Sequence, residues 1–209
     1  MNQRYPIPAV PFHTVQDTIK RSLFITYMAH TDTVEAAKAF IDSIRAKHPD
    51  ATHNCWAYMC GPPGDTARVG MSDDGEPHGT AGRPMLNVLL HGGVGELAVV
   101  VTRYFGGIKL GTGGLVRAYG GMVNLGLESL PVREKIIPVR YSVIMEYSHI
   151  TVFKRMLNEF EAMIKAEEFG ADAAFTLELP VEHAEKLEAA LIELTNGTVL
   201  IERLTQEDS

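Results

Sequence analysis

Apolar residues recur at helical spacing in the segment that follows residue 33. The stripe consists of Val34, Ala37, Ile41 and Ile44. Its period of three to four residues predicts a helix. Asp32 and Glu35 stand three positions apart and resemble a capping box, which makes Asp32 the predicted N-cap, and Pro49 lies just past the predicted end.

The remaining pattern of the first two thirds predicts strands that alternate with helices. Residues 1–13 form an expected extended lead-in, one or two strands are predicted within 15–29, and further strands are predicted at 53–60, 67–71 and 97–102. Further helical stripes begin at Met85 and at Leu115. Residues 72–84 lack an apolar period, so we expect a long polar loop there.

A second domain is predicted after the charged segment that Pro131 and Pro138 bracket. Strand patterns alternate with helical stripes in the order 141–147, 150–160, 164–169, 175–179, 184–194 and 198–204. This β-α-β-β-α-β order is the ferredoxin-like arrangement. The glycine content changes at the same place, because 17 of the 19 glycines lie between 61 and 126. The sequence therefore predicts an α+β protein with two domains, residues 1–137 and 138–209.

Charge is divided unevenly between the two predicted domains. The whole chain of 209 residues has a net charge of −7, which argues against a general nucleic-acid coat protein. Residues 1–137 carry 13 basic and 12 acidic residues, a net charge of +1. Residues 138–209 carry 6 basic and 14 acidic residues, a net charge of −8. We therefore expect phosphate binding in the first domain, and solvated faces or a docking surface for a protein partner in the second.

A glycine-rich segment at 99–121, VVVTRYFGGIKLGTGGLVRAYGG, is the first candidate site. It predicts a buried strand, a flexible turn and the start of a helix, and residues 97–127 contain no acid. A P-loop and a dinucleotide fingerprint are excluded, because neither the Gly-Lys-Ser/Thr ending nor the GxGxxG spacing is present. Cations and glycine N–H groups near a helix start predict a phosphate surface instead. Its candidate residues are Arg103, Lys109, Arg117, Gly106, Gly107, Gly111, Gly113 and Gly114.

Two interpretations of the aromatic pair in this segment are open. Tyr104 and Phe105 offer a stacking face for a nucleic-acid base if their rings are exposed. Alternatively, both rings belong to the core, and the glycines permit a helix to pack tightly against the sheet.

The polar loop carries a second candidate site, formed by Asp73, Asp74, Glu76 and His78. Clustered carboxylates beside a histidine are suited to a divalent metal or to acid–base chemistry. Their spacing matches no familiar ligand pattern, however, and Asp-Asp-Gly-Glu-Pro is typical turn chemistry. The alternative is a structural loop in which Asp74 or Glu76 accepts backbone N–H bonds and fixes the conformation.

The other reactive side chains predict neither a metal nor a cofactor. Cys55 and Cys60 form no CxxC motif, and we expect two buried thiols in a reducing compartment. The eight histidines include no HxH or HxxxH pair, and His53 is expected to be packed or hydrogen-bonded. The start of the chain lacks the apolar stretch of a signal peptide, and no apolar run reaches about 20 residues, so the expected location is the cytoplasm, without a membrane.

Two long motifs occur in order along the chain, SDDGEPHGTAGRPML at 72–86 and the glycine-rich segment at 99–121. Together with HNCWAY at 53–58, they closely resemble the YigZ branch of the IMPACT family, which is its bacterial branch. The resemblance implies a first domain similar to the superfold of a small-subunit ribosomal protein, RNase PH and domain IV of elongation factor G. It implies a ferredoxin-like second domain similar to domain V of that factor. Eukaryotic relatives are translation regulators that bind a ribosome-associated activator and so restrain the kinase that responds to amino-acid starvation.

The leading hypothesis is a non-enzymatic regulator of translation that binds RNA or the ribosome through its first domain. Arg83, Arg103, Lys109 and Arg117 are its predicted phosphate contacts. One alternative is a protein-partner adaptor without nucleic-acid binding. The other is a metal-dependent enzyme for phosphate chemistry, whose cleft combines the 72–80 loop with Arg103.

Overall fold

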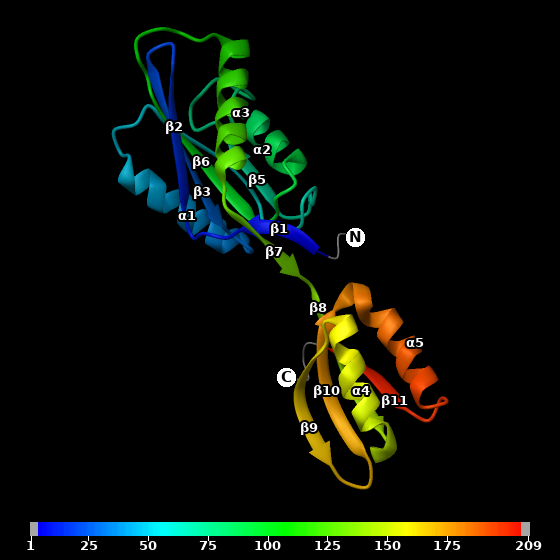
Figure 1. The fold of residues 1–209 in the computed structure, drawn as a ribbon. Coiled ribbons are helices and arrows are strands. Elements are labelled where there is room, and N and C mark those ends of the chain that lie inside the picture. Colours follow the sequence, from blue (N-terminus) through cyan, green and yellow to red (C-terminus); the bar gives the residue numbers. More distant parts are fainter. Residues whose placement is uncertain (1–3, 206–209) are drawn as a thin grey trace. The chain divides into compact units, whose positions relative to one another are not determined.

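The computed structural model describes residues 4–205, which divide into two compact units after Lys135 (Figure 1). Both units combine helices with β-sheets, so the protein has the predicted α+β class. Within residues 4–205, no helix has both the length and the apolar character that crossing a membrane requires.

A five-stranded antiparallel sheet forms the centre of the first unit. Its order is β2 (His13–Ile19), β3 (Ser22–His30), β6 (Leu97–Tyr104), β4 (His53–Met59) and β5 (Val69–Ser72). In the central strand β6, Val99 and Val101 pack into one hydrophobic cluster, and Ala98 and Val100 pack into another. Successive side chains point to opposite faces of a sheet, so both faces of β6 are covered. This explains its almost continuous apolar sequence.

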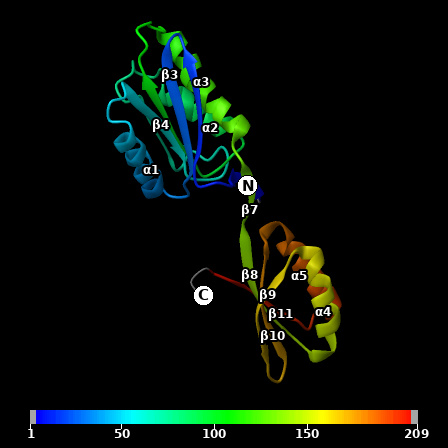
Figure 2. The ribbon, with the colours of Figure 1, turned by 60° about the vertical axis from the view of Figure 1, so that its left-hand side comes forward.

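Helices cover both faces of this sheet (Figure 2). One face carries α1 (Val34–Lys47), and the other carries α2 (Gly82–His91) and α3 (Thr112–Ser129). The N-cap of α1 is Thr33, whose Oγ1 accepts the N–H of Ala36 at 3.1 Å. The prediction of Asp32 as the N-cap is therefore wrong by one position, because the Thr33 hydroxyl takes the N–H that a capping residue satisfies.

A two-stranded sheet of β1 (Arg4–Pro8) and β7 (Val132–Ile136) was not among the predicted strands. Most of β7 is exposed and charged, so no hydrophobic period marks it. The buried carboxylate of Glu96 accepts hydrogen bonds from Tyr5 at 2.9 Å and His30 at 2.8 Å, and it pairs with Lys135. Burial alone would raise the pKa of Glu96, but these three partners outweigh burial and lower it. Glu96 thereby fastens both strands to the main sheet.

The second unit has the element order β-α-β-β-α-β that the sequence predicts. Its elements are β8 (Pro138–Met145), α4 (Ile150–Met156), β9 (Met163–Phe169), β10 (Ala173–Pro180), α5 (Ala184–Leu194) and β11 (Leu200–Leu204). Short 3₁₀ turns lie at Tyr147–His149, Leu157–Phe160 and Val181–His183. The antiparallel sheet has the order β11-β8-β10-β9, and α4 and α5 cover one of its faces (Figure 2). Phe153, Phe175 and Leu187 lie in the core between the sheet and these two helices.

Candidate functional site

The polar loop of residues 73–81 is closed by the carboxylate of Asp73. This carboxylate accepts the backbone N–H groups of Gly79 at 2.7 Å, Ala81 at 3.0 Å and Gly82 at 2.8 Å. Burial alone would raise the pKa of Asp73, but the backbone donors outweigh burial and lower it. Asp73 therefore holds the loop against the start of α2.

Asp74 ties the same loop to two further elements. Its carboxylate accepts hydrogen bonds from Arg45 of α1 at 2.8 Å and from the backbone N–H of Asn54 in β4 at 2.7 Å. Its carbonyl oxygen accepts the Nδ1 proton of His53 at 2.8 Å. Asp74 thus accepts a backbone N–H bond and His53 is hydrogen-bonded, which agrees with the structural interpretation of the loop.

These acidic residues do not converge on a metal site. Each of the three carboxylates in the loop is bonded to backbone N–H groups, to an arginine or to both. His78 is fully exposed, and its Nδ1 lies 3.8 Å from Asp73 Oδ2. Within the part of the chain that the structure describes, no group of three His, Cys, Asp or Glu side chains is arranged to hold a metal ion.

Glu76 points into the interior and pairs with Arg103 at the end of β6. Arg103 Nη1 donates to Glu76 Oε1 at 2.6 Å, and the hydroxyl of Tyr119 in α3 donates to the same oxygen at 2.7 Å. Glu76 is 7% exposed and Arg103 is 5% exposed, so both charges are removed from solvent. On the other side, Glu76 Oε2 lies 3.8 Å from His53 Nε2. The sequence predicts Arg103 as a phosphate contact, whereas in the structure its guanidinium is buried and its Nη1 is paired with Glu76.

Arg103 retains one hydrogen-bond donor without an acceptor. Its Nη2 donates to Ser22 Oγ at 3.4 Å, while its Nε is buried and has no partner. Ser22 Oγ also accepts the N–H of Gly106 at 3.2 Å. A Cβ at Gly106 would lie 1.9 Å from the carbonyl oxygen of Arg21, so only glycine fits there. The glycine-rich turn is therefore pressed against the β2–β3 hairpin.

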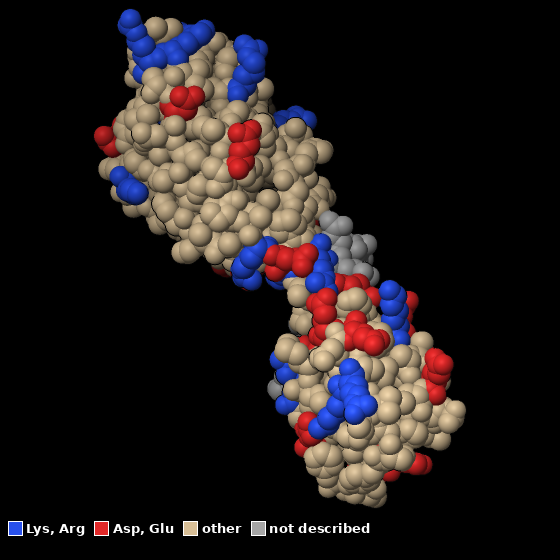
Figure 3. Space-filling view, in the orientation of Figure 1, with Lys and Arg blue, Asp and Glu red and all other residues tan. Residues whose placement is uncertain are grey.

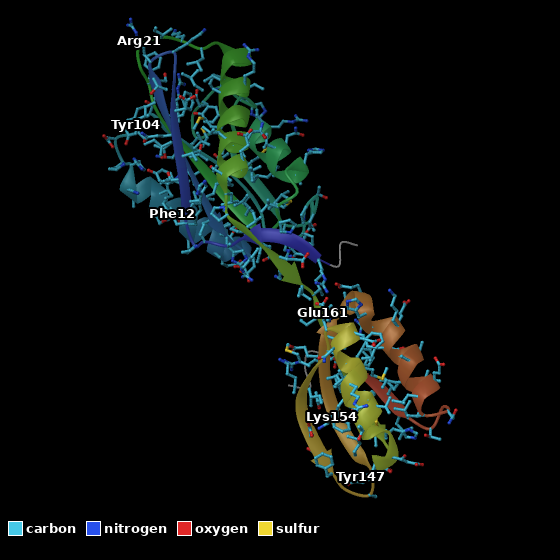
Figure 4. The ribbon with its side chains drawn as sticks, in the orientation of Figure 1. Phe12, Arg21, Tyr104, Tyr147, Lys154 and Glu161 are labelled. Atoms are coloured by element: carbon cyan, nitrogen blue, oxygen red, sulfur yellow. The ribbon has the colours of Figure 1, made fainter. Side chains whose placement is uncertain are left out.

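The aromatic pair of the segment is split between two surroundings. The Tyr104 hydroxyl lies 2.8 Å from His48 Nδ1 and donates to Asp50 at 3.2 Å, on the side of the sheet that α1 covers (Figure 4). Phe105 is 47% exposed, and its ring centroid lies 5.5 Å from the Arg103 guanidinium carbon. The two rings thus form no joint stacking face, and the alternative of two core rings is wrong for Phe105.

The polar loop and the glycine-rich segment meet at one pocket of about 380 Å³. Its lining residues are Thr52, His53, Glu76, Pro77, Arg103, Phe105, Lys109, Leu110, Gly111, Thr112 and Leu115. The sequence left open whether the two motifs share a surface, and the fold brings them together because β6 ends beside the loop.

The N-terminus of α3 also opens at this pocket. Gly111 is its N-cap, with φ of 75°, a backbone conformation that favours glycine. No side chain caps the helix and no acid occurs in its first turn, which begins at Thr112 and includes Gly113 and Gly114. The first N–H groups of a helix have no intrahelical acceptor and carry a partial positive charge. The pocket wall at this point therefore favours an anion.

Five exposed cations surround the pocket region, and we call them the cationic rim. They are Lys20, Arg21, Arg83, Lys109 and Arg117. Arg117 lines one groove of about 620 Å³ with Arg83 between α2 and α3, and a second hollow of about 230 Å³ with Lys20. Figure 3 shows basic side chains gathered at the end of the first unit where Figure 4 places Arg21.

Lys20 and Arg21 were missed by the sequence analysis. They form the turn between β2 and β3, and both have positive φ, 46° and 66°. The signal that could have found them is a pair of adjacent cations in the middle of 15–29, where one or two strands are predicted. Pairing of β3 with β6 then brings this turn beside the glycine-rich segment.

Comparison with known proteins gives the ancestry of both units. Residues 20–127 match the Impact N-terminal domain, and residues 143–198 match a domain of unknown function, DUF1949. The chain is 47% identical to the IMPACT family member YigZ of Escherichia coli over 193 residues. This alignment covers 92% of this chain and 94% of that protein. The chain belongs to the IMPACT family. All residues that line the 380 Å³ pocket lie within the Impact N-terminal match.

Two further relatives support this assignment to the IMPACT family. An IMPACT family member of Haemophilus influenzae is 39% identical over 199 residues, with 95% of each chain covered. A crystal structure of a hypothetical protein is 43% identical, has a TM-score of 0.67, and covers 99% of this chain and 100% of that one. The likeness therefore extends over both units.

Proposed function

We propose that this IMPACT-family protein is a non-enzymatic, translation-associated regulator whose first unit binds RNA or the ribosome. The cationic rim carries the proposal. Its five side chains are exposed, and within residues 4–205 none of them forms an ion pair. Unpaired cations that border a groove are suited to the phosphates of a nucleic-acid backbone. The absence of acids from 97–127 leaves the segment that carries Lys109 and Arg117 without a negative side chain.

Fold analogy supports the same proposal. The strand order of the second unit places its fourth strand beside its first, and its third between its first and second. We assign this order to the ferredoxin-like superfold, as in domain V of elongation factor G, and the first unit to the superfold of its domain IV. The proposed domains are 1–137 and 138–209, and the proposed location is the cytoplasm. The acidic second domain is the proposed docking module for a protein partner.

Salt dependence provides the quantitative expectation. Each phosphate contact contributes roughly 0.7–0.9 to the slope of log affinity against log salt concentration. A surface in which all five rim cations contact phosphates should therefore give a slope of roughly −3.5 to −4.5.

The test measures ribosome and tRNA binding across a salt series. The rim variant carries Arg83→Glu, Lys109→Glu and Arg117→Glu. A matched control carries Lys38→Glu in α1 and Arg155→Glu and Lys186→Glu in the second unit, three exposed positions that do not belong to the rim, with the same change in net charge. Arg103 is left unchanged, because its buried pair with Glu76 is part of the core.

The expected result is salt-dependent binding that the rim variant loses and the control retains. Equal losses in both variants would show that net charge alone matters, and they would overturn the proposal. Absence of binding by the wild-type protein at low salt would also overturn it, and would favour the adaptor hypothesis.

A further inference from the structure

The pocket beneath the cationic rim has properties that contact with a passing RNA backbone does not explain. Its volume of about 380 Å³ lies in the range of sites for small ligands, which is roughly 300–1,000 Å³. It combines apolar walls of Pro77, Leu110 and Leu115 with a few polar groups. This combination of apolar walls and a few polar groups is typical of sites for small ligands.

Arg103 lines this recess, and one of its donors has no partner. Its side chain is 6% exposed, and its Nε has no hydrogen-bond partner. Buried donors are nearly always satisfied, and an acceptor from outside the chain would account for this exception. Glu76 and Ser22 hold the rest of the guanidinium in place, which leaves the Nε in a fixed position.

Other lining residues add positive charge to the pocket. Lys109 lines the pocket and has no ion pair among the described residues. The uncapped start of α3 adds the N–H groups of Thr112 and its neighbours. Glu76 is the single carboxylate among the lining residues, and Arg103 neutralises it. The net field of the pocket therefore favours a phosphate group.

Phe105 supplies a second kind of recognition at the same pocket. Almost half of its surface is exposed, and the ring is held beside the Arg103 guanidinium. An aromatic ring with an accessible face is a stacking partner for a planar base. A phosphate seat and a stacking ring at one recess together match a nucleotide.

We propose that this pocket binds a nucleoside monophosphate, with its phosphate at the start of α3 beside Lys109 and Arg103 and its base on Phe105. The source is either a free nucleotide or the phosphorylated end of an RNA strand, because both present the same group. This inference does not rest on RNA binding by the cationic rim, since a free nucleotide would satisfy it.

The experiment is calorimetric titration of the full chain with AMP, UMP, adenosine and inorganic phosphate. Two short RNA oligonucleotides, one with a 5′-phosphate and one with a 5′-hydroxyl, identify the source. Thr112→Asp places a carboxylate in the first turn of α3, where it favours the helix but repels phosphate. Phe105→Ala removes the stacking ring and leaves the phosphate seat intact. Arg83→Glu with Arg117→Glu is the control, because it alters the rim outside the pocket.

The expected result is binding of AMP and UMP at least tenfold tighter than that of adenosine. Thr112→Asp should weaken every phosphate ligand at least tenfold without lowering the melting temperature. Phe105→Ala should weaken AMP by about fivefold or more and leave inorganic phosphate unchanged. A tenfold advantage of the 5′-phosphorylated RNA over AMP would identify an RNA end, and equal affinities would identify a free nucleotide.

Three outcomes would overturn the inference. The first is that the wild-type protein binds none of AMP, UMP and phosphorylated RNA. The second is that folded Thr112→Asp keeps its full affinity for these ligands. The third is that the rim control and Thr112→Asp lose affinity equally. If the pocket binds no nucleotide but tRNA binding still depends on the rim, the proposed function stands. If the pocket binds nucleotides but RNA binding does not depend on the rim, the inference about the pocket stands and the proposed function is overturned.

Discussion

Arg103 donates to Glu76 across 2.6 Å in the interior of the first unit, although 27 positions separate the two residues. The pair joins the polar loop to the end of β6. The hydroxyl of Tyr119 in α3 donates to the same carboxylate, so the helix is joined to it as well. The two motifs that the sequence presents as separate candidates are therefore parts of one packed structure, and their charged side chains serve its stability as well as its surface.

Removal of either charge should destabilise the protein strongly. Arg103→Met leaves the Glu76 carboxylate buried without its partner, and we expect a loss of about 3–5 kcal/mol in the free energy of unfolding. The double variant Arg103→Met/Glu76→Leu should recover part of that loss, because no unpaired charge is left. Urea denaturation of the full chain measures both. The control Arg83→Met should stay within about 0.5 kcal/mol of the wild type, and a similarly small effect of Arg103→Met would contradict the buried pair.

Asp73 should make stability depend on pH in a defined direction. Its pKa in the folded state lies below the ordinary value of 3.8, so its contribution is fully present above that value and is lost as the pH falls through the lowered pKa. Asp73→Asn is expected to lose about 1–3 kcal/mol at neutral pH. This deficit should shrink below about pH 4.

Urea denaturation between about pH 3 and pH 7 checks this dependence. Asp172→Asn, at an exposed position of the second unit, serves as the matched control. A deficit of Asp73→Asn that stays constant over this range would contradict the role of the ionised carboxylate.

The glycines of the first unit should respond to alanine in opposite ways. At Gly106 a Cβ would lie 1.9 Å from the Arg21 carbonyl oxygen, and we expect a loss of about 3 kcal/mol or a protein that does not fold. At Gly121, within α3, a Cβ would meet nothing within 4 Å, and alanine should stabilise the helix by up to about 1 kcal/mol. Thermal unfolding of the two variants separates these effects, and equal shifts would count against the close approach at Gly106.

Both cysteines should be inert in the folded protein. Burial raises the pKa of Cys55 and of Cys60, and each thiol donates to a backbone carbonyl, those of Asp73 and Thr33 respectively. The thiolate is the reactive species, so an aromatic disulfide reagent should label neither thiol in the native state and both in denaturant. Rapid labelling of either cysteine under native conditions would show that the first unit opens locally.

Elements with a clear hydrophobic period could be predicted from the sequence. Helix α1 and, in the second unit, the strands β8 and β10 and the helix α5 bury one regular face, so they could be predicted from the spacing of apolar residues. β1 and β7 escaped prediction because their stability comes from pairing with each other and from the contacts of Glu96, neither of which leaves a periodic pattern.

The sequence could predict which residue types form the candidate site, but not how their side chains are arranged. Arg103 and Lys109 stand close together in the sequence, yet one is buried against a carboxylate and the other is exposed. Their difference depends on Glu76, which the fold brings in from another segment. Lys20 and Arg21 belong to the same surface through the pairing of β3 with β6, a long-range relationship that local spacing does not encode.

The contact of Gly106 with the backbone of Arg21 has a consequence for how this surface can evolve. The distance between the β2–β3 turn and the glycine-rich turn is set by main-chain atoms and by Ser22, not by the cations above them. Each cation can therefore be exchanged alone, which alters the affinity for an anionic partner while the shape of the surface stays the same. Recognition can diverge among descendants of this chain without a new fold, provided that Gly106 is kept.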